Sequence, residues 1–255
     1  MAFLFRHNNR AYHQTRDWLL VYGSLWDRCV CWLWLPNQPV VGIIRQNDLS
    51  RNYSHSQISD TTTVGIFRQF LSQPSRVGAV AASSSVLANA MIDSLDWERI
   101  SVLVEYGPGT GAITRQIFSR IQQNENDQKD FFAIEVNDTF AENLATSFPD
   151  LDLAHDSVAN IEQLLHERGH DQMHAVVSGL PWTAFNETLQ DELLLPMIEH
   201  LSDGGEFVTF AYVHGLPLKS AKRFRKKLRD HFSSVVISRT IWRNIPPAIF
   251  YTCRK

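Results

Sequence analysis

Several features of common protein classes are absent from this sequence of 255 residues. No uncharged apolar run reaches the roughly 18 residues that a transmembrane helix needs, so we expect none. The first residues lack a basic segment followed by an apolar stretch and a small-residue cleavage site, so we expect no secretory signal. Only three cysteines occur, an odd count without the spacing of a disulfide framework, which indicates a reducing compartment such as the cytoplasm. The net charge of −3 excludes a globally basic protein but leaves local patches open.

Signatures of other catalytic classes are missing too. There is no Gly-x-Ser-x-Gly elbow and no lysine-bearing phosphate loop. His166, His170 and His174 are spaced by four residues, as metal ligands on one helix would be. Gly169 and a strand expected from His174 would break that helix, so we expect no metal site. Hydrophobic content of 44% and charged content of 20% are ordinary for a globular protein, and the length fits one α/β domain with an extension.

The pattern divides the chain into an extension, residues 1–62, and a domain, residues 63–255. The extension contains an apolar, tryptophan-rich segment at 18–35 and a polar stretch at 47–63 that is typical of a loop or a disordered linker. Two interpretations of the segment stay open. Tryptophan favours the headgroup zone, which suggests an interfacial membrane anchor, whereas a plain extension would pack on the domain or not fold.

The stretch that organises the domain runs from residue 100 to residue 138. The apolar, largely β-branched residues 100–104 predict a buried parallel strand that ends at Glu105. Helical spacing begins at Thr110. Between strand and helix stand three glycines in the pattern Gly-x-Gly-x-Gly, at Gly107, Gly109 and Gly111. Glycines in such a turn let the backbone approach a ligand closely.

A second apolar strand, 131–134, ends in another acid, Glu135. A glycine turn followed by an acid at the tip of the next strand is typical of an adenosine-binding site, where the acid can accept both ribose hydroxyls. Dinucleotide sites usually space their glycines as Gly-x-Gly-x-x-Gly and hold phosphate at the helix N-terminus. Here Glu105 precedes the glycines, and its charge would repel a pyrophosphate but suit the amino-acid end of S-adenosylmethionine. An ordinary glycine-rich loop is the alternative.

The rest of the domain alternates predicted strands and helices. Strands are expected at 151–154, 174–177, 206–212, 233–241 and 248–253, and helices at 64–72, 85–95, 138–147, 158–168, 191–201 and 218–232. Asp203-Gly-Gly is expected to be a turn, and the last two strands an antiparallel pair that closes the sheet. Asp156 follows the third strand at the same edge as Glu105 and Glu135, where it can also cap a helix.

Ser178-Gly-Leu-Pro-Trp182 follows the fourth strand. In an open α/β sheet this strand tip lies at the switch point where ligands bind. Small residues there would let a substrate approach, and Trp182 could form an apolar wall. An ordinary strand-to-helix turn is the alternative.

The helix expected at 218–232 carries seven basic residues within eleven positions. They are Lys219, Lys222, Arg223, Arg225, Lys226, Lys227 and Arg229. Such density suits an anionic surface, either lipid or nucleic acid, although a solvated charged face is the alternative. Together with the apolar side of the 64–72 helix, it predicts peripheral association with an anionic membrane surface; core packing is the alternative for the apolar side of that helix.

Motifs spread over about three quarters of the chain resemble those of bacterial phospholipid N-methyltransferases. These class I S-adenosylmethionine-dependent enzymes methylate phosphatidylethanolamine toward phosphatidylcholine. The motifs are Gln-Pro-Ser-Arg-Val-Gly-Ala-Val-Ala from residue 73, Val-Glu-Tyr-Gly-Pro-Gly-Thr-Gly from 104, Ala-Ile-Glu-Val-Asn from 133, Val-Ser-Gly-Leu-Pro from 177 and Trp-Arg-Asn-Ile-Pro-Pro-Ala from 242. All class I methyltransferases share the glycine motif, and the first, fourth and fifth motifs discriminate more. The resemblance favours S-adenosylmethionine over NAD.

The resemblance implies a Rossmann-like α/β fold, with a mostly parallel seven-stranded sheet, an antiparallel C-terminal strand pair and N-terminal helices. It implies cofactor contacts at the glycine loop and the neighbouring strand tips: Glu105, Gly107, Gly109, Thr110, Gly111, Glu135, Val136, Asp156, Ser157 and Ser178. Asp156 would contact the adenine amino group. For the transfer itself we expect the amine pocket at Tyr106, Ser178, Trp182 and Tyr212. Trp182 would hold the cationic headgroup by cation–π contact, and Arg243 and the basic helix would hold the lipid phosphate.

The sequence departs from related patterns at a few positions. Related rRNA adenine dimethyltransferases carry an asparagine at the fourth strand tip, and Ser178 stands there instead, which argues against adenine as substrate. Tyr106 replaces an expected leucine, Ala82 a proline, and His155 a glycine. Three classes of function stay open: a lipid N-methyltransferase, a nucleic-acid adenine methyltransferase, and a non-catalytic membrane-binding relic.

Overall fold

The computed structural model of the protein describes residues 30–35, 38–43, 84–123 and 129–255. Strands β1 (Val30–Leu35) and β2 (Gln38–Ile43) pair antiparallel as a hairpin. This hairpin, in a unit separate from the rest of the chain, was not predicted from the sequence. The predicted boundary at residue 62 and the predicted helix 64–72 lie outside the described residues.

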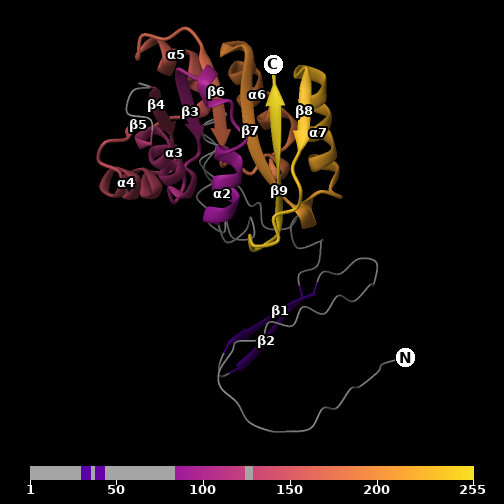
Figure 1. Ribbon diagram of the computed structural model, residues 1–255. Helices are drawn as coiled ribbons and strands as arrows, with labels where there is room; N and C mark the ends of the chain where they lie inside the picture. Colours follow the sequence, from indigo (N-terminus) through magenta and orange to yellow (C-terminus); the bar gives the residue numbers. More distant parts are fainter. Residues whose placement is uncertain (1–29, 36–37, 44–83, 124–128) are drawn as a thin grey trace, which may run out of the picture. The chain divides into compact units, whose positions relative to one another are not determined.

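A seven-stranded sheet organises the rest of the described chain (Figure 1). Its strands are β3 (Val102–Tyr106), β4 (Asp130–Ile134), β5 (Asp152–Ala154), β6 (Met173–Ser178), β7 (Leu201–Tyr212), β8 (Ser234–Ile237) and β9 (Ala248–Arg254). Their order across the sheet is β5-β4-β3-β6-β7-β9-β8. The first five are parallel, and β9 runs antiparallel to both of its neighbours. The predicted fold class is confirmed, and the carboxyl ends of the parallel strands meet at one edge.

Six α-helices are described in this part of the chain: α2 (Ser85–Ile92), α3 (Ala112–Gln122), α4 (Asp138–Ser147), α5 (Ile161–His166), α6 (Glu187–His200) and α7 (Lys219–His231). Short 3₁₀ turns lie at η2 (Trp97–Arg99), η3 (Val158–Asn160), η4 (Trp182–Ala184) and η5 (Val213–Gly215). Local chemistry explains several helix starts. The side chains of Ser84, Asn137 and Asn186 each accept a hydrogen bond from a first-turn N–H of α2, α4 and α6.

Two hydrophobic clusters pack on the two faces of the sheet. One joins Val102, Val104 and Tyr106 of β3 to buried residues of α5, α6 and α7. The other joins Leu103 to buried residues of α2 and α3. Because side chains alternate along a strand, Glu105 belongs to the α3 side and Tyr106 to the opposite side.

Some predicted boundaries were wrong. The first strand does not end at Glu105, since β3 continues through Tyr106. Asp203-Gly-Gly is not a separate turn but part of β7, where the pairing with β6 shifts register between Met173 and Ala175. Glycine tolerates the positive φ of 72° at Gly204 inside this irregular strand.

Candidate functional site

Backbone hydrogen bonds join the chain segments that leave the parallel strands. Gly107 N–H donates to the carbonyl of Ile134 over 2.9 Å, and Glu135 N–H donates to Ala154 over 3.0 Å. On the other side of β3, Gly179 N–H donates to the Tyr106 carbonyl over 2.8 Å. The glycine loop, the tip of β4 and the turn after β6 therefore lie together at the carboxyl edge, as the sequence predicted.

Close packing and open space alternate along the glycine loop. Gly107 and Gly109 adopt positive φ angles of 66° and 55°. A Cβ on Gly107 would lie 2.4 Å from Leu180 Cδ2, and one on Gly179 would lie 2.5 Å from the Gly107 carbonyl oxygen. A Cβ on Gly109 would meet no atom within 4 Å. The absence of a side chain at Gly179 therefore lets the turn after β6 pack against the glycine loop. At Gly109, the same loop leaves room for a ligand.

Glu105 is a fully buried carboxyl group beside this loop. Its Oε2 accepts a 2.8 Å hydrogen bond from the hydroxyl of Thr114, on α3. Its Oε1 is buried and has no hydrogen-bond partner among the described residues. Burial raises the pKa of Glu105 from 4.5 to about 8, and the nearby charge of Glu135 adds to the rise. An unsatisfied buried carboxyl oxygen fits a cationic partner, such as the ammonium of an amino-acid moiety.

Glu135 lies at the tip of β4 and is held by backbone donors. Its Oε2 accepts from Gly109 N–H over 3.0 Å, and its Oε1 accepts from Asn137 N–H over 2.9 Å. Burial raises its pKa, and the backbone hydrogen bonds and His155 oppose that rise. Each carboxylate oxygen keeps a further acceptor site, so the oriented group fits two ribose hydroxyls.

The remaining predicted cofactor residues lie around these two acids. Asp156 Oδ1 accepts from Ser157 N–H over 2.6 Å and from the Asn160 side-chain amide over 3.0 Å. The buried Ser157 hydroxyl accepts from Ala159 N–H. These are the bonds of a cap, so the adenine contact of Asp156 stays a prediction. Val136 is buried and Thr110 is exposed.

Ser178 and Trp182 contact each other, but inside the core. Trp182 Nε1 donates to Ser178 Oγ over 2.9 Å. The indole is 1% exposed and stacks on Phe224 of α7, with ring centroids 5.3 Å apart. The structure therefore places Trp182 between the sheet and α7, where it shapes the turn after β6. It offers no ring face to a headgroup, unlike the predicted apolar wall.

The two tyrosines predicted for the amine pocket lie on opposite faces of the sheet. Tyr106 pairs with Ser178 in the β3–β6 register and is fully buried, which raises the pKa of its hydroxyl well above the usual range. Tyr212, at the end of β7, is half-buried and packs with the α2–α3 cluster. Its ring stacks on His214, with centroids 5.7 Å apart. The structure does not gather the four predicted reaction residues into one pocket.

Sequence reasoning missed Thr114 and His214. Thr114 is the polar residue of the first turn of α3 that faces the sheet, and this position is readable from helical spacing once Glu105 is placed. His214 directly follows β7, and the strand end was itself predicted at Tyr212.

The basic helix α7 is partly neutralised by neighbouring acids. Arg223 lies 3.8 Å from Glu187, and Lys227, only 13% exposed in its side chain, pairs with Asp191 of α6. Lys226 pairs with Asp230 over 2.5 Å. Lys219 and Lys222, in the first turn, are exposed. Three of the seven basic residues predicted to suit an anionic surface are therefore paired with acids.

The described residues form neither a membrane-spanning helix nor a metal-binding cluster. None of the described helices is long and apolar enough to span a bilayer. In the same part of the chain, no group of three or more His, Cys, Asp or Glu side chains could hold a metal ion.

The chain has a clear relative among known proteins, although no family model matches it. The ornithine lipid N-methyltransferase of Singulisphaera acidiphila is 30% identical over 189 residues, which are 73% of this chain and 92% of the relative. The aligned length therefore spans nearly the whole of that enzyme.

Solved structures share the fold at low identity. The 1,6-didemethyltoxoflavin-N1-methyltransferase of Burkholderia thailandensis, bound to its substrate and S-adenosylhomocysteine, matches with a TM-score of 0.54 and 14% identity over 79% of this chain and 92% of its own. The O-methyltransferase TomG of Streptomyces achromogenes, bound to S-adenosylmethionine, matches with a TM-score of 0.52 and 13% identity. The match covers 78% of this chain and 92% of TomG. The predicted cofactor agrees with both ligands. The chain has the class I methyltransferase fold and belongs to the family of bacterial lipid N-methyltransferases.

Proposed function

We propose that this protein transfers a methyl group from S-adenosylmethionine to the amine of a membrane lipid. The observation that carries the proposal is the pair of buried carboxyl groups, Glu105 and Glu135, at the glycine loop. Membership of the lipid N-methyltransferase family supports the lipid substrate.

The residues at the carboxyl edge fit the parts of this cofactor. The unpartnered Oε1 of Glu105 would accept from the amino group of the methionine moiety. The carboxylate of Glu135, oriented by Gly109 and Asn137, would accept from the two ribose hydroxyls. The open space at Gly109 would admit the ligand next to the backbone. The bound cofactor supplies an activated methyl group on a sulfonium.

The protein's own work in the reaction is alignment, exclusion of water and removal of a proton. A lipid amine is protonated at neutral pH and must lose a proton before it can attack the methyl group. An imidazole is a frequent proton acceptor in such steps. His214, exposed at the end of β7 and stacked on Tyr212, is the candidate among the described residues. Ser178 and Trp182 position the turn after β6.

The headgroup is the finer part of the proposal. The motifs of the sequence favour phosphatidylethanolamine, whereas the relative is named for an ornithine lipid. Both headgroups carry a primary amine, so the same kind of amine pocket would accept either of them. Purified protein with labelled S-adenosylmethionine and vesicles of each lipid should label at least one of them, and the more rapidly labelled lipid identifies the headgroup.

A parallel reaction with rRNA tests the alternative substrate. Label in RNA and none in either lipid would overturn the proposal in favour of a nucleic-acid methyltransferase. Absence of cofactor binding in calorimetry would instead indicate a non-catalytic relic. Glu142→Ala, on the exposed surface of α4, is a matched control for substitutions of the buried acids.

A further inference from the structure

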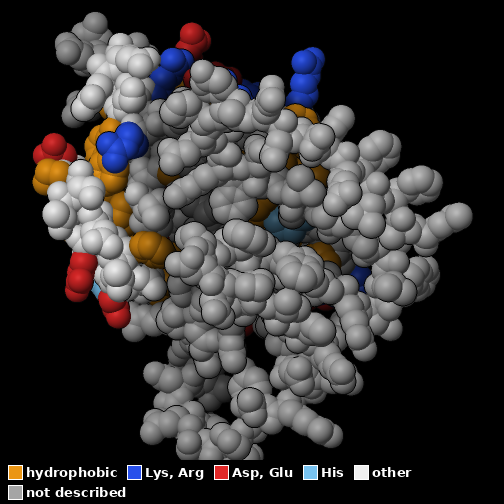
Figure 2. All heavy atoms as spheres, turned by 90° about the horizontal axis from the view of Figure 1, so that it is seen from below, with side chains coloured by type: hydrophobic (Ala, Val, Ile, Leu, Met, Phe, Trp, Pro, Cys, Tyr) orange, Lys and Arg blue, Asp and Glu red, His pale blue; other side chains and the backbone are white. Residues whose placement is uncertain are grey.

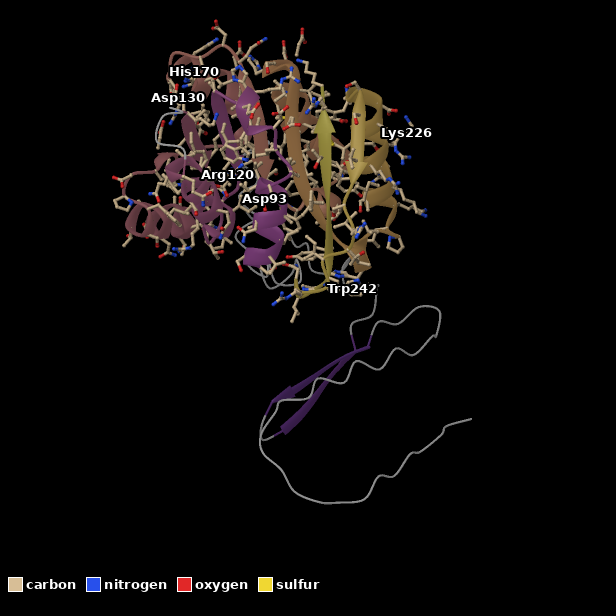
Figure 3. The ribbon with its side chains drawn as sticks, in the orientation of Figure 1. Asp93, Arg120, Asp130, His170, Lys226 and Trp242 are labelled. Carbon is tan, nitrogen blue, oxygen red and sulfur yellow. The ribbon has the colours of Figure 1, made fainter. Side chains whose placement is uncertain are left out.

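The loop between Ile241 and Ala248 lies at the edge of the sheet that holds the candidate site. Ala248 pairs with Tyr212, the last residue of β7, and Val213 N–H donates to the Pro247 carbonyl over 2.9 Å. Figure 3 shows Trp242 at the lower edge of the sheet, away from Asp130 at the start of β4, which lies at the upper edge. The lower edge is the one toward which the parallel strands run.

This loop exposes two large apolar side chains. Trp242 is 73% exposed and Ile245 is 83% exposed. Leu218, which precedes α7 and follows η5 at the same edge, is 56% exposed. Seen from below, some hydrophobic side chains of the described residues are visible at the rim of this face (Figure 2). An apolar surface rimmed by polar groups marks a site of protein or membrane contact.

Asn244 fixes the direction of these side chains. It is 1% exposed, its Oδ1 accepts from Ser84 N–H over 2.8 Å, and its Nδ2 donates to the Pro246 carbonyl over 2.6 Å. The residue between the two exposed side chains is thus anchored inward at the start of α2. The loop therefore presents Trp242 and Ile245 outward as part of its folded form.

The charges around the loop are of one sign. Residues 213–222 and 238–250 contain no aspartate or glutamate. Arg243 stands between the two apolar side chains, and Lys219 and Lys222 lie in the first turn of α7; all three are exposed. Among the cations farther along α7, Arg223, Lys226 and Lys227 pair with acids, whereas Arg225 and Arg229 are exposed, so the positive surface extends from the loop along this helix.

We propose that the loop 241–247 is the membrane-docking element of this protein. Trp242 and Ile245 insert among the headgroups of an anionic bilayer, and Arg243, Lys219 and Lys222 lie against lipid phosphates. Tryptophan at the interface and basic residues beside it are the chemistry that such a surface recognises. The inference rests on the proposed function, since docking at this edge brings lipid amines to the glycine loop.

Vesicle sedimentation tests the docking element directly. We compare vesicles of phosphatidylethanolamine mixed with phosphatidylglycerol and vesicles in which phosphatidylcholine replaces the phosphatidylglycerol. The double variant Trp242→Ser/Ile245→Ser should bind the anionic vesicles at least about tenfold more weakly, because two apolar side chains no longer leave water. Arg243→Ala should reduce the preference for anionic vesicles by about fivefold. Val236→Ser, which changes a 60% exposed side chain on β8, is the matched control and should bind as the wild type does.

A conservative variant covers the case in which the double variant misfolds. Brominated lipids should quench part of the tryptophan emission of the wild type. The Trp242→Phe variant should still bind vesicles, but its remaining tryptophan emission should no longer show this quenching. Unchanged quenching in Trp242→Phe, or unchanged binding by a folded double variant, would overturn the docking proposal.

Methyl transfer separates the two proposals. With short-chain phosphatidylethanolamine dispersed as monomers, the double variant should transfer methyl groups at the wild-type rate. If the wild type transfers no methyl group to any lipid but binds vesicles through Trp242, the proposed function fails and the docking element stands. If transfer occurs and the double variant still binds vesicles fully, the docking element fails alone.

Discussion

Replacing Glu105 with glutamine tests whether the buried carboxyl is held neutral until a cation binds. Glutamine keeps the shape and an acceptor for the Thr114 hydroxyl but cannot ionise. In the cofactor-free protein the pKa of Glu105 is raised from 4.5 to about 8, chiefly by burial. The folded state therefore keeps a proton that the unfolded chain releases, so the free energy of unfolding falls as pH rises from 4.5 to about 8.

The magnitude follows from the width of that window. At about 1.4 kcal/mol per pH unit, the difference between 4.5 and about 8 corresponds to a loss of about 5 kcal/mol. The nearby Glu135 also has a raised pKa and contributes in the same direction. Glu105→Gln removes the contribution of one carboxyl and its repulsion of the other, so the variant should be the more stable form at high pH.

Two measurements carry this test. Denaturant unfolding of the cofactor-free protein across the window should show a steep fall for the wild type and a shallow one for Glu105→Gln. Calorimetry should show that S-adenosylmethionine binds the wild type more tightly as pH rises toward 8, with affinity at pH 7 about tenfold below its plateau. The variant should bind roughly ten- to a hundredfold more weakly at the plateau, because a charge-assisted hydrogen bond is lost.

Equal pH slopes of stability in wild type and Glu105→Gln would refute this reasoning. Glu142→Gln, at an exposed position of α4, should follow the wild type in both measurements. A Glu105→Gln variant with undiminished cofactor affinity would remove the assignment of Glu105 to the amino group.

Three further changes test single contacts of the site. Glu135→Ala should weaken cofactor binding by about a hundredfold in calorimetry, because two ribose hydrogen bonds are lost; unchanged affinity would remove the ribose assignment. Thr114→Val should raise the pKa of Glu105 above 8 and move the pH midpoint of cofactor binding upward, whereas Thr114→Ser should restore it; a fixed midpoint would contradict this. Gly179→Ala, whose Cβ would lie 2.5 Å from the Gly107 carbonyl oxygen, should cost about 1–3 kcal/mol in thermal unfolding, and an unchanged melting temperature would show that the two turns can separate.

Much of the fold was predictable because its signals are local. The apolar run 131–134 and the cap at Asn137 are short patterns, and the structure has β4 and α4 at these places. The start of β7, in contrast, does not follow from a local pattern. Asp203-Gly-Gly is typical of a turn, but pairing with β6 at Leu201 before it and at Glu206 after it keeps the segment within β7, and β6 is remote in sequence.

The cofactor side of the site was more predictable than the reaction side. Glu105 and Glu135 each come at or after the end of a predicted parallel strand, so their meeting at one edge follows from the topology. Trp182 is different, because Phe224 of α7 covers its ring and this contact depends on tertiary packing. The opposite orientation of Glu105 and Tyr106 was readable in principle, since adjacent strand residues face opposite sides.

A count of charges in the sequence overestimated the unpaired positive charge of α7 for a similar reason. The sequence shows seven cations on 219–229, but the acids that pair with two of them stand on α6, about forty residues earlier. Only the three-dimensional arrangement reveals which cations pair with acids; Lys219 and Lys222, at the start of α7, are exposed, as are Arg225 and Arg229.

The most direct measurement is transfer of labelled methyl from S-adenosylmethionine to vesicles that contain phosphatidylethanolamine or an ornithine lipid together with an anionic lipid. Wild type and Glu142→Ala should place label in the lipid fraction, and Glu135→Ala should do so far more slowly at limiting cofactor. Label confined to RNA, or equal lipid labelling by wild type and Glu135→Ala, would contradict a lipid N-methyltransferase that works through this site.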